Sequence, residues 1–258
     1  MRVTILGSGS EGNATLFDTG CTRILIDAGL SLRQLRDRAA HAMNAALERL
    51  DAIVITHSHG DHVAHAARIA KAFGAPIYAQ PETAEAAGLT ANVYDANVSF
   101  RIGAIEVSPL RVPHDVPQVA LVLRHQGDVV GLVTDLGHVP RALPKHLSGC
   151  RTVLLESNHD PELLAIAPYP VFVRARIGGS HGHLANAQTA RLLKRLRKGP
   201  LERVVLMHLS QKANSPEKAY RIARQALGPE VELRVASQNT PMVLPSLQTR
   251  QLSFDYVS

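Results

Sequence analysis

Four side chains that can bind a metal ion stand within six residues of one another, at His57, His59, Asp61 and His62. They follow the apolar segment 53–55, which is typical of a short buried strand. In extended backbone the two leading histidines point to the same side and can share one ion. The last two ligands, where the chain turns into a helix, can face a second ion beside the first. A polar loop with chance histidines explains this density poorly, so the pattern predicts a metal centre.

Three further ligand types each come directly after a strand-like segment: His114, Asp135 and His208. Taken alone, each would more often be a hydrogen-bonded structural residue. Their shared position favours a ligand role, because ligands gather at the carboxyl ends of strands in α/β sheets. We expect them to complete a centre for two divalent ions, and mixed histidine and aspartate ligands accept Zn, Mn or Fe.

A glycine-rich segment near the start imitates a nucleotide-binding motif. Gly7, Gly9 and Gly12 spell G-x-G-x-x-G after a strand-like run, and Asp27 lies 20 residues after Gly7. The dinucleotide fingerprint, however, needs a helix that begins in the glycine loop. Residues 13–27 are β-branched, alternating and interrupted by Gly20, which leaves no room for that helix. We expect a tight turn between two antiparallel strands instead.

Strand-like and helix-like segments alternate along the chain and must position these ligands. The pattern predicts layered α/β sheets with helices outside. We expect strands at 3–6, 14–18, 23–27, 52–55, 76–79, 105–112, 118–124, 129–134, 152–156, 203–207 and 230–236. We expect helices at about 31–50, 62–73, 185–198 and 215–228, the last with an N-cap serine followed by proline.

Composition limits the class of protein. The 258 residues are 45% hydrophobic and 19% charged, which is typical of a globular chain and excludes disorder and coiled coil. We expect one domain, 1–258, made of two β-rich halves with helices in each. Apolar runs are too short to span a membrane, the first residues reach glycine too soon for a secretory signal, and Cys21 and Cys150 form no C-x-x-C pair. These features predict a cytoplasmic protein.

Charge and aromatic content indicate a partner class. The net charge is +6 and the sequence pI about 9.6, which favours a polyanionic partner. The absence of Trp and an aromatic content of 4% argue against a single-strand reader built on base stacking. A dense basic run at residues 191–198 could meet phosphates or could be a solvated helix face, and the sequence leaves both readings open.

At His57–His62 the chain resembles the metallo-β-lactamase superfamily, whose hallmark is H-x-H-x-D-H. The resemblance implies a four-layer αββα sandwich with a dinuclear site at the open edge of its two sheets. By position, the first ion would be bound by His57, His59 and His114 and the second by Asp61, His62 and His208, with Asp135 bridging. Asp27 matches the aspartate that orients the site from behind the ligands. Asp61 and Asp27 are thus expected to serve catalysis.

A closer likeness covers most of the chain and points to the YycJ/WalJ branch of that superfamily. It rests on residues 7–13 and on Glu156-Ser157-Asn158-His159-Asp160, Tyr169-Pro170, Arg176-Ile177, Gly182-His183-Leu184 with Asn186, and His208-Leu209-Ser210. The branch is associated with metal-dependent 5′-to-3′ exonuclease action on DNA and with suggested roles in repair. The resemblance therefore implies a phosphodiesterase that acts on DNA.

Related phosphodiesterases carry a histidine in a G-H-x-x segment upstream of the last ligand, which makes His183 the expected proton donor to the leaving oxygen. Expected substrate contacts are Arg174, Arg176, Asn158 and His159. Only 47 residues separate Asp135 from His183, too few for the capping domain of the β-CASP nucleases. The alternatives are a small-molecule (thio)ester or cyclic phosphodiester hydrolase of the same fold, and a metal-binding regulator without activity. Strandedness and oligomeric state stay open.

Overall fold

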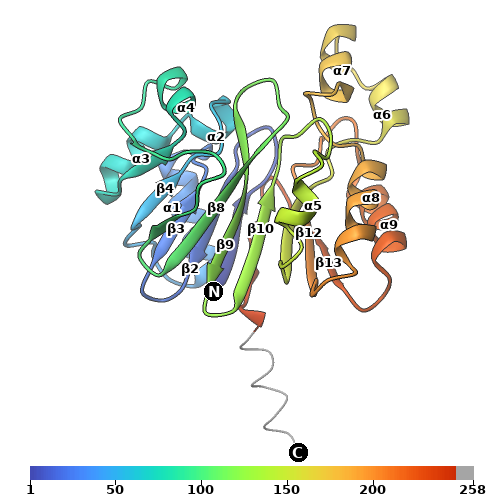
Figure 1. Cartoon of the computed structure of the whole chain (residues 1–258). Coiled ribbons are helices and arrows are strands. Elements are labelled where there is room, and N and C mark those ends of the chain that lie inside the picture. Colours follow the sequence, from blue (N-terminus) through green and yellow to red (C-terminus); the bar gives the residue numbers. More distant parts are fainter. Residues whose placement is uncertain (248–258) are drawn as a thin grey trace, which may run out of the picture.

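Two seven-stranded sheets form the middle of the molecule (Figure 1), in a computed structural model that describes residues 1–247. The first sheet has the strand order β14 (Met242–Leu244), β1 (Arg2–Gly7), β2 (Ala14–Asp18), β3 (Arg23–Ile26), β4 (Ala52–Val54), β5 (Ile77–Ala79), β6 (Asn92–Val93). The second has the order β13 (Glu232–Val235), β12 (Arg203–Met207), β11 (Thr152–Glu156), β10 (Asp128–Val133), β9 (Gln118–His125), β8 (Ile105–Val112), β7 (Phe100–Ile102).

Helices cover the outer face of each sheet and complete four layers (Figure 1). Those that follow strands of the first sheet are α1 (Leu32–Met43), α2 (Gly60–Val63), α3 (Ala66–Phe73) and α4 (Pro81–Ala86). Those on the other half are α5 (Leu143–His146), α6 (Pro161–Ile166), α7 (Val171–Gly178), α8 (Asn186–Leu196) and α9 (Pro216–Leu227). This is the predicted αββα sandwich. Within residues 1–247, no helix combines the length and the apolar character needed to cross a membrane.

Both faces of each sheet are apolar because both are covered. In β3, Ile24 and Ile26 belong to the core between the sheets, whereas Leu25 belongs to the core under the helices. Side chains alternate between the faces of a strand, so this short apolar run supplies two cores at once. The same holds for β9, where Leu121 and Leu123 point between the sheets and Val122 toward the helices.

The parallel strands bring the predicted ligands to one edge. β3 pairs with β4, and β11 pairs with both β10 and β12, all in parallel. Asp27, His57, Asp135 and His208 follow the ends of β3, β4, β10 and β12. Since the carboxyl ends of parallel strands meet at one edge, residues far apart in the sequence gather there.

Several elements differ from the sequence predictions. The helix expected over 31–50 ends at Met43, because Asn44 takes a left-handed backbone with φ 52°. The helix expected over 62–73 is two helices, since His65 donates its backbone N–H to Ala28 outside the helix. The sequence analysis predicted none of β6, β7, β14, α4, α5, α6 and α7.

The glycine loop is a turn, as expected. β1 and β2 pair in antiparallel fashion on either side of it, and no helix follows. Gly9 and Gly12 have φ angles of 144° and 140°, which L-residues with a side chain rarely adopt. The segment therefore matches the dinucleotide fingerprint in sequence but not in structure.

Candidate metal centre

The segment between β4 and α2 carries four of the predicted ligands, and two neighbouring loops hold it in place. Asn13 donates its backbone N–H to the Asp61 carbonyl at 2.7 Å, and Ala28 donates to the His62 carbonyl at 2.6 Å. A Cβ atom on Gly29 would lie 1.8 Å from the Asp61 carbonyl oxygen. Only glycine permits this approach, so the loop after β3 fixes the position of the ligands after β4.

Three ring nitrogens converge in the first cluster. His59 Nδ1 lies 3.2 Å from His57 Nε2 and 3.2 Å from His114 Nε2. The other ring nitrogens are engaged elsewhere: His57 Nδ1 lies 3.1 Å from Thr56 Oγ1, and His114 Nδ1 donates to the Gly182 carbonyl at 3.1 Å. This leaves three nitrogen lone pairs facing one point, the donor set of a divalent transition metal.

A second cluster lies beside the first. Asp61 Oδ2 is 3.4 Å from both His62 Nε2 and His208 Nε2. As in the first cluster, the far ring nitrogens are anchored: His62 Nδ1 donates to Asp27 Oδ2 at 2.7 Å, and His208 Nδ1 donates to Glu156 Oε1 at 3.1 Å. A carboxylate behind a ligating histidine orients the ring and makes it more basic.

Asp135 joins the two clusters. It lies 1% exposed, with Oδ2 3.2 Å from His62 Nε2, and it groups with His57 and His62 as a further ligand set. Oδ2 is fully buried and accepts no hydrogen bond from residues 1–247. A buried carboxylate oxygen without a hydrogen bond is costly, and a cation shared by both clusters would satisfy it. The residues present therefore fit metal ions.

Burial and charge divide the histidines into two kinds. Burial lowers the pKa of His57, His59 and His114, so these rings are neutral and offer their lone pairs. Burial also opposes protonation of His62 and His208, but the surrounding carboxylates, Asp135 foremost, outweigh it and raise both pKa values, that of His208 to about 10. A cation that binds these two rings has to displace their protons.

Asp27 supports the centre without facing either cluster's open side. Its Oδ1 accepts from the Thr56 backbone N–H at 2.9 Å and from the Thr56 hydroxyl at 3.0 Å, while Oδ2 holds His62. Asp27, Asp135 and His208 are all in the left-handed region, with φ of 61°, 58° and 53°. Non-glycine residues in this region are uncommon and collect at functional sites.

Glu156 is a site residue to which the sequence analysis assigned no role. It is fully buried at the end of β11, and its Oε1 accepts from His183 Nδ1 at 2.9 Å as well as from His208. Burial raises the pKa of Glu156, but the charge and hydrogen bond of His183 outweigh it and lower that pKa to about 2. The available signal was its place: an acid that ends a buried apolar strand, like the aspartate after β10.

His183 lies beside the second cluster. Its side chain is 20% exposed, and its backbone N–H donates to the Ile177 carbonyl at 2.9 Å. Because Nδ1 is held by Glu156, Nε2 is the ring atom that can exchange a proton with a substrate. The ring is close to two predicted ligands, with centroids 5.5 Å from His114 and 5.3 Å from His208.

The structure does not bring the four expected substrate contacts to one place. Arg176 binds Asp115 Oδ2 through Nε at 2.6 Å, and Asp115 Oδ1 lies 3.2 Å from His59 Nε2, so this arginine stands at the rim of the first cluster. Asn158 is buried and donates to the His208 carbonyl at 2.8 Å, a contact that holds the ligand's backbone. Arg174 and His159 line a separate hollow between helices α6, α7 and α8.

Comparison with known proteins decides the family. A family model described as the Beta-lactamase superfamily domain matches residues 22–209. The chain belongs to this superfamily. The family and the clustered histidines and aspartates together indicate that the chain binds divalent metal ions.

Curated relatives within the superfamily align over nearly the whole chain. The chain is 29% identical to exodeoxyribonuclease WalJ of Streptococcus pneumoniae, over 95% of this chain and 96% of the relative. It is 29% identical to exodeoxyribonuclease YycJ of Bacillus anthracis, over 88% of this chain and 89% of the relative. The metallo-beta-lactamase fold protein YhfI of Bacillus subtilis superposes with a TM-score of 0.74 at 18% identity, covering 95% of this chain and 99% of that one. The predicted fold and family are confirmed.

Proposed function

We propose that this chain is a metal-dependent phosphodiesterase that degrades DNA from an end in the 5′-to-3′ direction and serves DNA repair in the cytoplasm. The observation that carries the proposal is the pair of ligand clusters joined by Asp135, with a further histidine, His183, held beside them by the buried carboxylate of Glu156. The names of the curated relatives, exodeoxyribonucleases WalJ and YycJ, support DNA as the substrate.

Two divalent ions per chain, Zn or Mn with Fe as a third choice, fit the two clusters. The first would be held by His57, His59 and His114, the second by Asp61, His62 and His208, and both by Asp135. When bound, such ions supply a nucleophile from water near neutral pH and neutralise charge on the phosphate. Asn13 holds Asp61 in place, because its side-chain amide donates to Asp61 Oδ2 at 3.1 Å.

His183 supplies the proton that the leaving oxygen needs. An alkoxide is a poor leaving group, and general acid assistance typically contributes ~10²–10⁴-fold. Glu156 orients the ring, because its Oε1 accepts from Nδ1 at 2.9 Å and thereby leaves Nε2 as the ring atom that can give a proton to the leaving oxygen. Asp27 acts through His62 and Thr56 and is a positioning residue for the second cluster.

The test uses the purified protein with Mn²⁺ or Zn²⁺ added back. End-labelled DNA should be shortened progressively from its 5′ end, and bis-p-nitrophenyl phosphate should be hydrolysed. A thioester assay runs beside them. Strong thioester turnover without cleavage of either phosphodiester would overturn the proposal in favour of a small-molecule hydrolase, and cleavage of the nitrophenyl ester alone would remove DNA as the substrate.

A further inference from the structure

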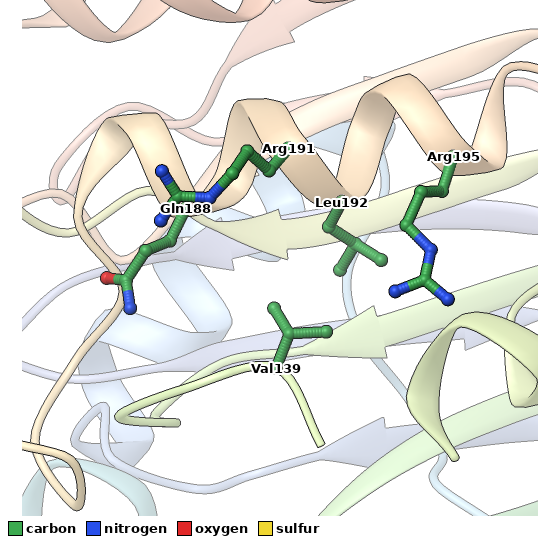
Figure 2. A pocket seen from close by; sticks show the side chains of 5 residues that line it. All are labelled: Val139, Gln188, Arg191, Leu192 and Arg195. Carbon is green, nitrogen blue, oxygen red and sulfur yellow. The ribbon is translucent and has the colours of Figure 1, made fainter. Parts of the chain in front are cut away.

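Three hollows lie in a row along α8 and share walls. The first, about 650 Å³, lies between α6, α7 and α8, and Gln188 and Arg191 belong both to it and to the next hollow. The middle hollow, about 350 Å³, ends at Arg195, which also lines the outer hollow of about 420 Å³. Figure 2 shows Gln188 and Arg191 at one end of the middle hollow and Arg195 at the other, with Val139 facing Leu192 between them. This row of neighbouring hollows is here called the α8 groove.

Of the residues that the structure describes, those lining the α8 groove include cations and no acid. Its basic side chains are Arg174, Arg191, Arg195, Lys145 and Lys198. Within residues 1–247 none of the five forms an ion pair with a carboxylate, whereas many other surface arginines do, such as those at 49, 111 and 151. Unpaired cations at successive turns along a groove give a track of positive potential suited to a polyanion.

The first hollow lies next to the segment that carries His183. α8 begins three residues after His183, and His159 lines the hollow beside Ala185. The backbone joins the two segments here, since Asn158 donates its N–H to the Leu184 carbonyl at 3.0 Å and Asn186 donates its N–H to the His159 carbonyl at 2.8 Å. His159 is 3% exposed and its Nδ1 is buried without a hydrogen-bond partner in the described part of the chain. An unpartnered buried donor or acceptor in a hollow wall points to a ligand that completes it.

The chemistry of the first hollow suits a nucleotide. Leu164, Val171 and Ala175 provide apolar walls, while Arg174 and Arg191 stand at its sides. Apolar walls with a few convergent polar groups are typical of small-ligand sites, and the volume lies within their usual range. Recognition here uses aliphatic walls rather than aromatic stacking, consistent with the 4% aromatic content.

We propose that the α8 groove is the path of the DNA strand, with one unpaired nucleotide in the first hollow and the following phosphates along Arg191, Arg195 and Lys198. This inference rests on the proposed function for its substrate and assigns the surface that holds it. From Gln188 to Leu196 the helix rises about 12 Å. At ~3.4 Å per phosphate along a stacked strand, this length accommodates three to four phosphates.

The structure assigns different positions to two neighbouring basic residues of α8 that the sequence alone does not distinguish. Arg195 lines two of the hollows, whereas Lys194, one position earlier and also exposed, lines none of the three. A solvated helix face would make these positions equivalent. A strand in the α8 groove makes Arg195 a phosphate contact and leaves Lys194 outside it.

The experiment compares the wild type with Arg191→Glu/Arg195→Glu and with a matched control, Arg68→Glu/Lys71→Glu. The control changes the charge equally on α3, where both residues are exposed and line none of the three hollows. Binding of a short fluorescent phosphorothioate strand, which keeps its charge and resists hydrolysis, is measured by anisotropy across a range of salt. Thermal melts verify that each variant is folded.

We expect the groove variant to reduce the log–log salt slope by about 1.4, because two phosphate contacts at ~0.7 each are lost. When the salt concentration rises tenfold, the loss of affinity in the groove variant is therefore smaller than the loss in the wild type by a factor of about 25. The control should keep the wild-type slope, and Lys194→Glu should lie near the control. Equal slopes for the groove variant and the control would overturn the proposal, as would a blunt duplex that binds as tightly as the single strand.

Failure of this proposal is distinguishable from failure of the proposed function. If the metal-loaded protein shortens DNA but the salt slope is unchanged by the substitutions at Arg191 and Arg195, the centre is a nuclease and the groove does not bind its DNA strand. If the slope falls as expected but no DNA is cleaved, the groove binds the strand and the nuclease assignment is wrong.

Discussion

Replacing Glu156 by glutamine removes one negative charge from a buried side chain surrounded by donors. Oε1 accepts from one backbone N–H and two histidine rings, and Oε2 from two backbone N–H groups. The donors are Asp135 N, Leu136 N, Leu184 N, His183 Nδ1 and His208 Nδ1. An amide has one oxygen, so its NH₂ group must face donors on one of these two sides.

The smaller loss of folding stability is expected if the NH₂ group takes the place of Oε2. The backbone N–H groups of Leu136 and Leu184, 3.4 and 2.8 Å away, then lose their acceptor. Each orphaned buried donor costs about 1–3 kcal/mol, so the free energy of unfolding falls by about 2–6 kcal/mol. For a chain of this size that lowers Tm by roughly 4–24 °C. His208 also loses its charged partner, and such supporting carboxylates typically contribute ~10–100-fold to metal affinity.

The assay is a thermal melt beside metal titration, on Glu156→Gln and on Glu202→Gln. Glu202 is the matched control, because it accepts a hydrogen bond from Arg151 at the surface and touches no ligand. The control should melt and bind metal like the wild type. A Glu156→Gln protein with wild-type Tm and wild-type metal affinity would refute the claim that this carboxylate holds the centre together.

Three further outcomes follow from the geometry. Asp135→Ala should lose at least one divalent ion per chain and all hydrolysis, and full metal occupancy with activity in that variant would contradict a shared ligand. His183→Ala should keep its metals and lose ~10²–10⁴-fold on DNA but far less on an activated nitrophenyl ester, whose leaving group hardly needs the proton; equal losses on both substrates would remove the donor role. Gly29→Ala should disrupt the centre, since its Cβ would lie 1.8 Å from the Asp61 carbonyl oxygen. A Gly29→Ala protein with unchanged metal content would show that the loop after β3 can shift to accommodate the added methyl group.

The ligands could be predicted because their signals are local. His57 to His62 form one short run after an apolar strand, and Asp135 and His208 each end a strand whose composition is plain. The structure brings all seven predicted ligands into the two clusters joined by Asp135. Glu156 carries the same strand-end signal, but its role depends on donors from three other segments, and sequence spacing does not report those contacts.

The groove could not be predicted, for a physical reason. α7 buries none of its side chains, so its sequence has no apolar stripe to mark a helix. Without α7, the position of Arg174 beside α8 cannot be predicted. The sequence also does not distinguish residues that line the groove from residues that lie elsewhere, among Arg174, Arg176, Asn158 and His159. The early end of α1 did carry a signal, since asparagine tolerates the left-handed cap that Asn44 adopts.

The left-handed backbone at Asp27, Asp135 and His208 affects the stability of the chain before it has bound metal. Each such residue costs of order 1 kcal/mol, and Asp135 Oδ2 is buried without a hydrogen-bond partner among residues 1–247. Ions that bind the native chain and not the unfolded one offset this by mass action. Cells starved of divalent metal should therefore hold less of the protein, because the unloaded chain opens more often and is degraded.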